Sequence, residues 1–152
     1  MLSMKAKYGL QAMTALAREY GNGPVLIADL AAAEKIPRKF LELILLELKR
    51  KGILQSKKGK GGGYHLRSHP SQISVGELIR ALDGTIALLP CVSQTAYRRC
   101  EECIDEAACG IRSVMKEVRD ATAEILDGTS LEELIRRSRR FPETGKPVMY
   151  HI

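Results

Sequence analysis

The residues with the most distinctive chemistry in this chain are four cysteines in one short segment. They are Cys91, Cys100, Cys103 and Cys109. Four thiolates can complete a tetrahedral zinc site, and three or four can hold an iron–sulfur cluster of the 2Fe–2S or 4Fe–4S type, so spacing alone does not choose the metal. In a reducing compartment such a group binds metal or does redox chemistry more often than it forms structural disulfides. We therefore predict a cysteine-ligated metal site, with an iron–sulfur cluster as the first choice and zinc as the alternative.

The residues around these cysteines are charged. Arg98 and Arg99 precede Cys100 and would favour its thiolate form, which suits either metal ligation or oxidation. Acidic neighbours such as Glu101 and Glu102 disfavour the alternative that the cysteines are small core residues. The sequence places no histidine near them to activate one as a nucleophile. We therefore predict that the protein is not an enzyme.

Basic residues gather in a different segment, between residues 34 and 67. It contains ten Lys or Arg against three Glu, a charge of +7, whereas the whole chain has 24 basic and 18 acidic residues, a net charge of +6. The rest of the chain is therefore close to neutral. A local cationic surface of this kind suits binding to a phosphate backbone, because neutralising phosphates releases condensed counterions. From charge alone, a solvated basic face is the alternative.

The elements around this basic segment follow from apolar spacing. A first helix is predicted up to the stop at Gly21–Pro24, a short second helix covers 27–33, and a third begins after Ile36–Pro37 and runs from 38 to 51. A glycine-rich, lysine-bearing hairpin over 53–67 follows them. Two helices joined by a tight turn and followed by a hairpin form a winged helix-turn-helix. We therefore expect double-stranded DNA as the partner.

The expected DNA contacts lie at two places. The N-terminal end of the third helix would enter the major groove, and the hairpin would act as a wing whose lysines contact phosphate while its glycines allow close approach. The alternative for the hairpin is a merely flexible turn. The predicted DNA-binding residues are Arg38, Lys39 and Glu42 in the helix and Lys57, Lys58, Lys60, Gly61 and Gly62 in the wing.

After the wing, Ser74 and Glu77 predict a capping box for a helix over 75–82, and Ser130 with Glu133 caps a short final helix. Between them, apolar residues alternate at three and four positions, which is typical of a coiled-coil seam. The predicted dimerisation residues are Ile111, Val114, Val118, Ala121 and Ile125. A helix that faces the core of its own chain is the alternative to a homodimer.

These patterns predict a mainly α-helical fold with a small β-hairpin wing, in which a winged helix-turn-helix is joined to a long dimerisation helix. The expected divisions are 1–84 for the DNA-binding domain, 85–110 for the cluster-binding loop, 111–140 for the dimerisation helix and short final helix, and 141–152 for a tail. The sequence has neither the apolar run of a signal peptide nor the roughly 20 apolar residues of a membrane span. We expect a cytoplasmic protein with no membrane partner.

Several motifs in combination resemble the Rrf-two family of bacterial winged-helix regulators, over residues 1 to 128. The matching segments are Lys7–Ala12, Ile36–Pro37, Phe40–Glu42, Gly59–Tyr64 and Ile73–Ile79. The resemblance implies a homodimer joined along the long helix, two winged domains that read a palindromic operator, and a cluster whose state alters DNA affinity.

Three positions depart from the family pattern. Cluster-binding members commonly space three cysteines five residues apart, and here only Cys103 and Cys109 keep that spacing. A related iron–sulfur regulator has a histidine three positions after its last cysteine, where this chain has Arg112, which leaves Cys100 as a substitute fourth ligand. In the third helix, Leu43 replaces a glutamine that is common in the family, so no operator sequence can be transferred.

The resulting hypothesis is a cluster-dependent switch. Cluster binding or loss would reorder residues 91–109, shift the helix that follows, and change the spacing of the two recognition helices. One alternative keeps DNA binding but replaces the cluster with a thiol–disulfide switch or structural zinc. Another is a redox or cluster-carrying protein that does not bind DNA and whose basic surface meets an acidic protein partner.

Overall fold

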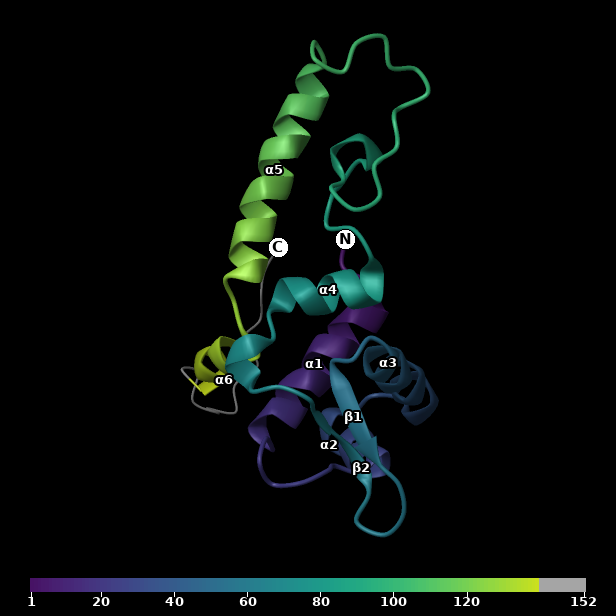
Figure 1. The fold of residues 1–152 in the computed structure, drawn as a ribbon, viewed down its shortest axis with the longest axis vertical. Helices are drawn as coiled ribbons and strands as arrows, with labels where there is room; N and C mark the ends of the chain where they lie inside the picture. Colours follow the sequence, from purple (N-terminus) through teal and green to yellow (C-terminus); the bar gives the residue numbers. More distant parts are fainter. Residues whose placement is uncertain (140–152) are drawn as a thin grey trace, which may run out of the picture.

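A computed structural model describes residues 1–139 of the chain. Its helices are α1 (Met4–Arg18), α2 (Ile27–Glu34), α3 (Arg38–Arg50), α4 (Val75–Asp83), α5 (Gly110–Asp127) and α6 (Leu131–Arg139). Strands β1 (Leu54–Lys57) and β2 (Gly63–Leu66) form an antiparallel hairpin, and 3₁₀ turns occupy Pro70–Gln72 and Pro90–Val92. In Figure 1, α5 and the cysteine segment extend as an arm from a body made of the other elements. The predicted fold class is confirmed.

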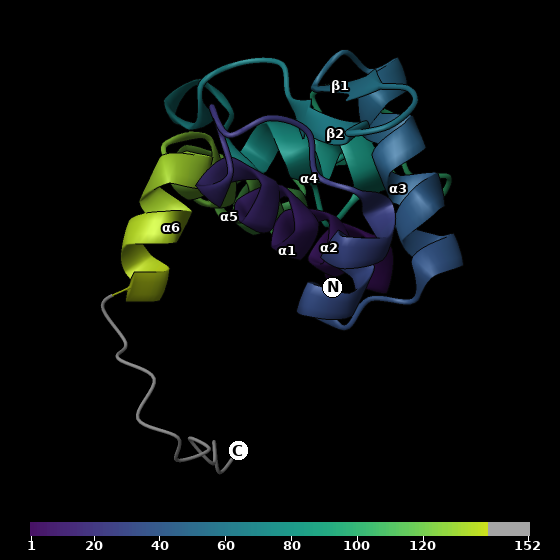
Figure 2. The ribbon, with the colours of Figure 1, turned by 90° about the horizontal axis from the view of Figure 1, so that it is seen from below.

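The core of the body surrounds α1, which contacts α2, α3, α4 and α6 (Figure 2). Met13 of α1 and Ile44 of α3 are fully buried, and Gly9 allows α4 to approach closely, because a Cβ there would lie 2.2 Å from Leu82 Cδ1. Burial of each large apolar side chain contributes about 1.5–3 kcal/mol. Helix α1 ends at Arg18, before the predicted stop at Gly21–Pro24, and the Tyr20 side chain is exposed.

Local hydrogen bonds set the beginnings of the helices. The Ser74 hydroxyl accepts the backbone N–H of Glu77 at 3.1 Å, and the Ser130 hydroxyl accepts that of Glu133 at 3.1 Å, as the two predicted capping boxes require. Lys35 ends α2 in the left-handed region, with φ of 54°, and Pro37 is the N-cap of α3. The tight turn of the helix-turn-helix therefore follows from sequence-local geometry.

The wing is attached to the body by a contact that the sequence pattern did not predict. Leu54 pairs with Leu66 and Lys57 with Gly63 in the hairpin, while Val25, just before α2, forms an isolated bridge with Tyr64. A Cβ at Gly63 would lie 2.1 Å from the Val25 carbonyl oxygen. The glycine is therefore needed for this close approach, which fixes the base of the wing beside the helix-turn-helix.

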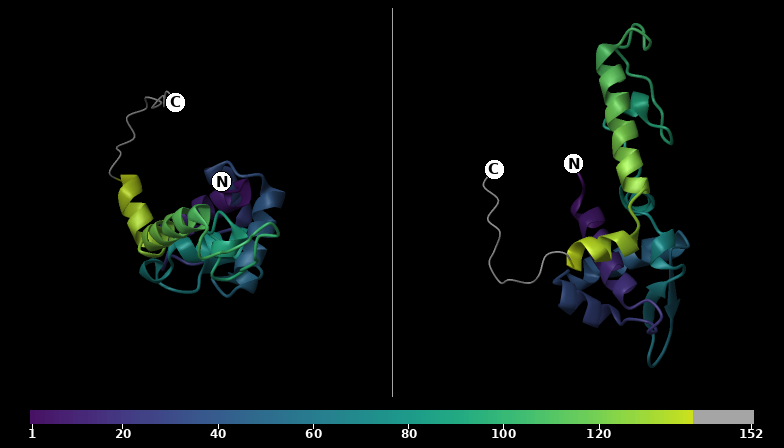
Figure 3. Two further views of the ribbon diagram at one scale, coloured as in Figure 1. Left: turned by 90° about the horizontal axis from the view of Figure 1, so that it is seen from above. Right: turned by 90° about the vertical axis from the view of Figure 1, so that its left-hand side faces the viewer.

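Among residues 1–139, the contacts between the arm and the body that we describe lie at the C-terminal end of α5. No residue of α5 is buried, and Figure 3 shows the helix projecting away from the remaining helices. At its C-terminal end, Arg80 of α4 makes two hydrogen bonds with the Asp127 carboxylate, at 2.6 and 2.9 Å. The Val75 N–H donates to the Thr129 carbonyl at 2.8 Å beside them. Helix α5 is therefore joined to α4 at this end by an ion pair and a neighbouring backbone hydrogen bond.

Two further sequence predictions concern the ends and environment of the chain. None of the helices in the region that the structure describes is long and apolar enough to cross a membrane. The predicted tail, 141–152, and the boundary at residue 140 lie outside the described residues.

Candidate DNA-binding surface and cysteine pocket

The third helix of the body presents a polar face opposite its buried one. Leu41, Ile44, Leu45 and Leu48 are buried, whereas Arg38 and Lys39 are exposed. Arg38 Nε donates to the Glu42 carboxylate at 3.3 Å, and both side chains stay largely accessible to solvent. The N-terminal end of α3 therefore offers a guanidinium–carboxylate pair and a lysine to a ligand in front of it.

The basic residues at the other end of α3 have different roles. Glu47 pairs with Lys5 of α1 at 2.6 Å and with Lys51 at 3.7 Å, and the Lys51 ammonium also donates to the Ala81 carbonyl. Lys51 is exposed and at the same time contacts α4. Lys49 and Arg50 are exposed and remain available for contacts outside the protein.

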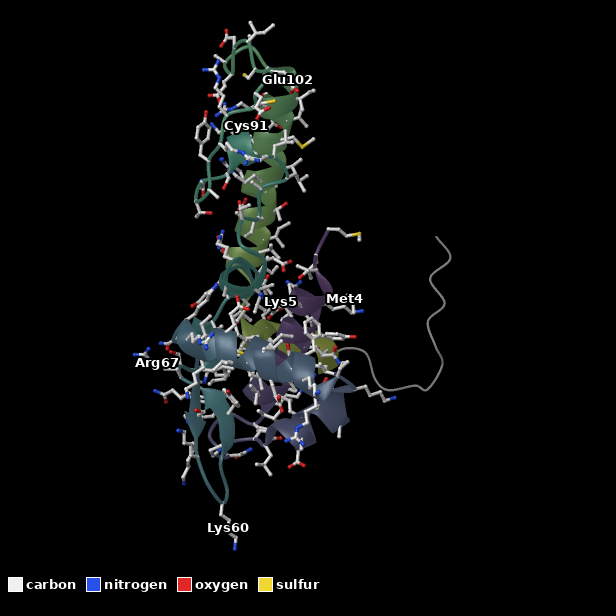
Figure 4. The ribbon with its side chains drawn as sticks, turned by 90° about the vertical axis from the view of Figure 1, so that its right-hand side faces the viewer. Met4, Lys5, Lys60, Arg67, Cys91 and Glu102 are labelled. Atoms are coloured by element: carbon white, nitrogen blue, oxygen red, sulfur yellow. The ribbon has the colours of Figure 1, made fainter. Side chains whose placement is uncertain are left out.

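The wing carries exposed cations at and near its tip. Lys57, Lys58 and Lys60 are all exposed, and Figure 4 shows Lys60 extending beyond the hairpin. Gly61 is exposed with φ of 74°. Gly62 is instead buried, and its N–H donates to the Gly59 carbonyl at 3.0 Å, so we assign it to holding the turn and not to contacting DNA.

All four cysteines line one cavity of about 830 Å³ at the far end of the arm. Cys91, Cys103 and Cys109 are half-buried and Cys100 is exposed, so the idea that they are core residues is wrong. Arg98, Arg99 and Arg112 also line the cavity, as do the acidic residues Glu101, Glu102, Asp105 and Glu106. The structure therefore brings the four predicted ligands to one charged pocket, although they are separated by up to 18 positions in sequence (109 − 91).

Two arginines of α5 hold the turn that bears Cys91. Arg112 Nε donates to the Cys91 carbonyl at 3.3 Å, and the Arg119 guanidinium donates to the Val92 carbonyl at 2.6 Å. The Arg119 side chain is only 13% exposed, although it also pairs with Asp120. Sequence reasoning considered Arg112 only as a missing ligand and did not identify Arg119, because both hydrogen bonds join segments more than 20 positions apart. Cys91 is therefore positioned by α5 as well as by its own loop, in which the Arg98 N–H donates to the Pro90 carbonyl at 3.1 Å.

The other cysteines are held by local contacts. Cys109 is the N-cap of α5, and its sulfur accepts the Arg112 backbone N–H at 3.4 Å. The Cys103 N–H donates to the Cys100 carbonyl at 3.2 Å. The Tyr97 hydroxyl donates to the Glu106 carboxylate across the base of this loop, and this hydrogen bond raises the pKa of the Tyr97 phenol above its ordinary value.

The cysteine donor set fits a thiolate-ligated cluster or zinc in its chemistry, since soft thiolates are the ligands that both prefer. Within residues 1–139, however, no three His, Cys, Asp or Glu side chains are close enough to hold a metal ion as they are arranged. Cys100 is exposed and Cys103 is half-buried, in a segment whose residues are mostly exposed.

The predicted dimerisation residues form an apolar stripe along α5 that the described chain leaves uncovered. Exposed fractions are 67% for Ile111, 55% for Val114, 38% for Val118 and 64% for Ile125, and Ala121 is also exposed. The alternative that this stripe faces the core of its own chain is therefore wrong for residues 1–139. Ile111 also lines the cysteine cavity, so the stripe and the pocket adjoin.

A winged helix-turn-helix followed by such an arm matches a known family, described as iron-dependent transcriptional regulators, over residues 2–137. The chain belongs to the Rrf2 family. This is the Rrf-two family that the sequence motifs resemble. Its members among the comparisons are named as HTH-type transcriptional regulators and not as enzymes, which confirms the prediction that the chain is a transcriptional regulator without enzymatic activity.

Individual Rrf2 relatives match the chain over most of its length. An rrf2-like putative HTH-type regulator of Rhodobacter capsulatus is 41% identical, covering 89% of this chain and 92% of the relative. CymR of Bacillus subtilis is 32% identical over 88% of each protein. The solved structure of that CymR, described as a global cysteine regulator, superimposes with a TM-score of 0.75 over 90% of this chain and 97% of the other.

A second solved Rrf2 regulator, IscR of T. potens, also superimposes with a TM-score of 0.75. It is 27% identical and covers 99% of this chain and 96% of the other. Similarity to both CymR and IscR shows a winged-helix regulator, and it does not by itself choose the signal that is sensed.

Proposed function

We propose that this chain is a cytoplasmic, homodimeric regulator that binds a palindromic DNA operator with an affinity controlled by an iron–sulfur cluster on its cysteine loop. The observation that carries the proposal is the single cavity lined by all four cysteines, next to the exposed apolar stripe of α5. Cys91, Cys103 and Cys109 are the first three proposed ligands, and Cys100 is the proposed fourth. A bound cluster would supply reversible sensitivity to iron supply, oxidants or nitric oxide.

The path from this pocket to DNA consists of contacts between described residues. Arg112 and Arg119 tie the Cys91 turn to α5, and the Arg80–Asp127 ion pair ties α5 to α4. Helix α4 packs against α1 and α3 in the body. A change at the cysteines therefore moves α5, and paired α5 helices would change the separation of two α3 helices, which must lie about 34 Å apart to read successive major grooves.

The DNA contacts in this proposal come from the α3 face and the wing. Arg38 and Glu42 are placed for base edges, while Lys39 and the wing lysines are placed for phosphates. The cationic surface, its location on a helix-turn-helix and membership of a family of transcriptional regulators all support DNA as the ligand. They weigh against the cluster-carrier alternative, in which the same surface would bind an acidic protein.

A thiol switch is the second candidate, and one observation favours it. Within residues 1–139 all four cysteines line one pocket, but no three of them are arranged to hold a metal ion. Such an arrangement also suits oxidation of two cysteines to a disulfide. CymR of Staphylococcus aureus, which is 28% identical over 89% of this chain, has been solved in an oxidized form. A structural zinc in the same pocket is the remaining version of this alternative.

The test combines metal analysis with DNA binding on protein purified without oxygen. We expect visible absorption of a thiolate-bound cluster, equal amounts of iron and sulfide, and little zinc. An operator selected from random duplex DNA should then bind holo- and apoprotein with different affinities across a salt titration. A protein that stays colourless after anaerobic reconstitution contradicts the cluster, and equal affinity of both forms contradicts the coupling.

Single substitutions identify the ligands in the same assay. Cys91→Ser, Cys103→Ser and Cys109→Ser should each lose most of the iron, while Ser113→Ala, on an exposed position of α5, should retain it. If Cys100→Ser also loses the iron, Cys100 is the fourth ligand. Full retention of iron in the Cys91, Cys103 or Cys109 variant removes that residue from the proposed set.

A further inference from the structure

Helix α3, the proposed recognition helix, carries an exposed leucine that takes no part in the hydrophobic core of the described residues. Leu43 is 66% exposed in the middle of α3, whereas the other leucines of that helix are buried or half-buried. Isolated apolar residues on protein surfaces are common and need no explanation by themselves. The position of Leu43 in the DNA-facing row of α3 is what distinguishes it.

Leu43 lies in a row of residues directly opposite the buried face of α3. Helical geometry puts positions four and seven apart on one face, so Lys39, Leu43 and Arg50 line up along the outside of the helix. Both flanking residues are exposed cations. The ligand that complements such a row is an acidic macromolecule. It would place two phosphates against the cations and an apolar group between them, against the leucine.

Duplex DNA offers that combination in its major groove. The thymine C5-methyl group is the apolar feature of base edges there, and apolar side chains long enough to reach it read it by direct contact. We propose that Leu43 contacts a thymine methyl in each half-site and is a specificity-determining residue of this regulator. This inference rests on the proposed DNA-binding function and adds the base that this position reads.

The polar residues near Leu43 are suited to different features of the DNA bases from those that Leu43 can contact. Glu42, which directly precedes Leu43, and Arg38, one turn before Glu42, form a hydrogen-bonded pair that is suited to donor and acceptor atoms of neighbouring bases. Leu43 has no polar atom in its side chain, so it favours thymine only through apolar contact. Replacement by glutamine should change the selected base, because the glutamine amide pairs with adenine.

The experiment begins by selecting operators from a random duplex pool with the wild type, Leu43→Ala and Leu43→Gln. Leu2→Ala is the matched control, since Leu2 is 44% exposed and precedes α1, outside α3, the wing and the cysteine loop. Each thymine conserved in the wild-type consensus is then replaced by deoxyuridine, which removes only the methyl group. Affinity is measured by fluorescence anisotropy at fixed salt.

For the wild type and Leu2→Ala, we expect one such replacement to weaken binding by about fourfold per half-site, the factor that burial of one methyl group supplies. Leu43→Ala should bind thymine and deoxyuridine operators equally. If deoxyuridine has the same effect on the wild type and on Leu43→Ala at every position, the inference is wrong, and an apolar protein partner becomes the occupant to seek. A wild type that selects no DNA sequence at all contradicts the proposed DNA-binding function as well.

Discussion

At the scale of single residues, Arg112 and Arg119 of α5 hold the turn that bears Cys91. The Cys91 turn is held within its own loop by the Arg98 N–H, which donates to the Pro90 carbonyl, and from α5 by Arg112 and Arg119, which donate to the Cys91 and Val92 carbonyls. The Arg119 guanidinium is nearly buried, so its hydrogen bond to Val92 competes little with water. The reactivity and ligand geometry of Cys91 should therefore depend on residues that are not ligands.

Arg119→Met tests this dependence in the apoprotein. Loss of one charge-assisted hydrogen bond, about 1.5 kcal/mol, should free the turn and raise the alkylation rate of Cys91 by about tenfold, with no change at the exposed Cys100. Site-resolved mass spectrometry after brief iodoacetamide treatment measures both rates. Arg18→Met, at the exposed end of α1, serves as the control. Equal acceleration at both cysteines would indicate general loosening of the loop and contradict a specific role.

At the scale of elements, local sequence signals set where a helix begins, whereas its packing against other elements determines its role. The Ser74 cap starts α4 at the point where Val75 and Ile73 make backbone hydrogen bonds to the α5–α6 connection. Helix α5 has an N-cap of its own and an apolar stripe, yet packs almost nothing against that stripe within the described chain. Stability of the body and pairing of the arm can therefore be tested separately.

The cap of α4 predicts a change in stability. Ser74→Ala removes the acceptor for the Glu77 N–H and should lower the free energy of unfolding by about 1 kcal/mol. Urea denaturation followed by circular dichroism measures this change. Ser113→Ala is the comparison, because Ser113 lies on an exposed position inside α5 and caps nothing. Equal effects of the two substitutions would show that the cap contributes no specific stability.

The stripe of α5 predicts a change in assembly. Val118→Glu places a charge in the middle of the apolar seam, where burial of an unpaired carboxylate is strongly unfavourable. Sedimentation at micromolar concentration should show a monomer with an unchanged helical spectrum, and affinity for a palindromic operator should fall by at least tenfold. Lys116→Glu, on the face of α5 opposite the seam, should remain dimeric. A dimeric Val118→Glu protein would place the interface elsewhere.

At the scale of the whole molecule, the arm and the body meet at one ionic joint. Asp127 ends α5 and Arg80 lies on α4, and Gly76 leaves room for the carboxylate, since a Cβ there would lie 1.9 Å from Asp127 Oδ1. The Arg80 guanidinium holds the pKa of Asp127 below its ordinary value, through their hydrogen bond first and through charge second. The joint is partly exposed, so its contribution is modest and sensitive to salt.

The lowered pKa of Asp127 fixes the sign of a pH effect. A carboxyl group whose pKa is lower in the folded state stabilises that state above its unfolded pKa of about 3.9, and this contribution is lost as pH falls through the folded value. Asp127→Asn should therefore be less stable than the wild type at pH 7, and the difference should shrink below about pH 4. A double-mutant cycle with Arg80→Met isolates the pair. A difference that is independent of pH would contradict the ionic contribution.

The sequence alone determined the elements, because their signals are local. Serine caps, the Ile36–Pro37 break, glycine stops and apolar spacing depend on neighbours within a turn or two, and the helices begin and end within a few residues of the predicted positions. The same locality made the recognition helix, the wing and the α5 stripe predictable. Four cysteines in one segment also indicated a shared site before any coordinates.

Only the tertiary structure decided how these elements act on one another. The bridge from Val25 to the wing, the Arg119 contact with the Cys91 turn and the Arg80–Asp127 joint all connect residues at least 27 positions apart, whose pairing no local pattern encodes. Burial of Gly62 and exposure of Leu43 likewise depend on what packs nearby. The physical reason is that local hydrogen bonds are specified by adjacent residues, whereas ion pairs and close approaches exist only after the core has brought distant segments together.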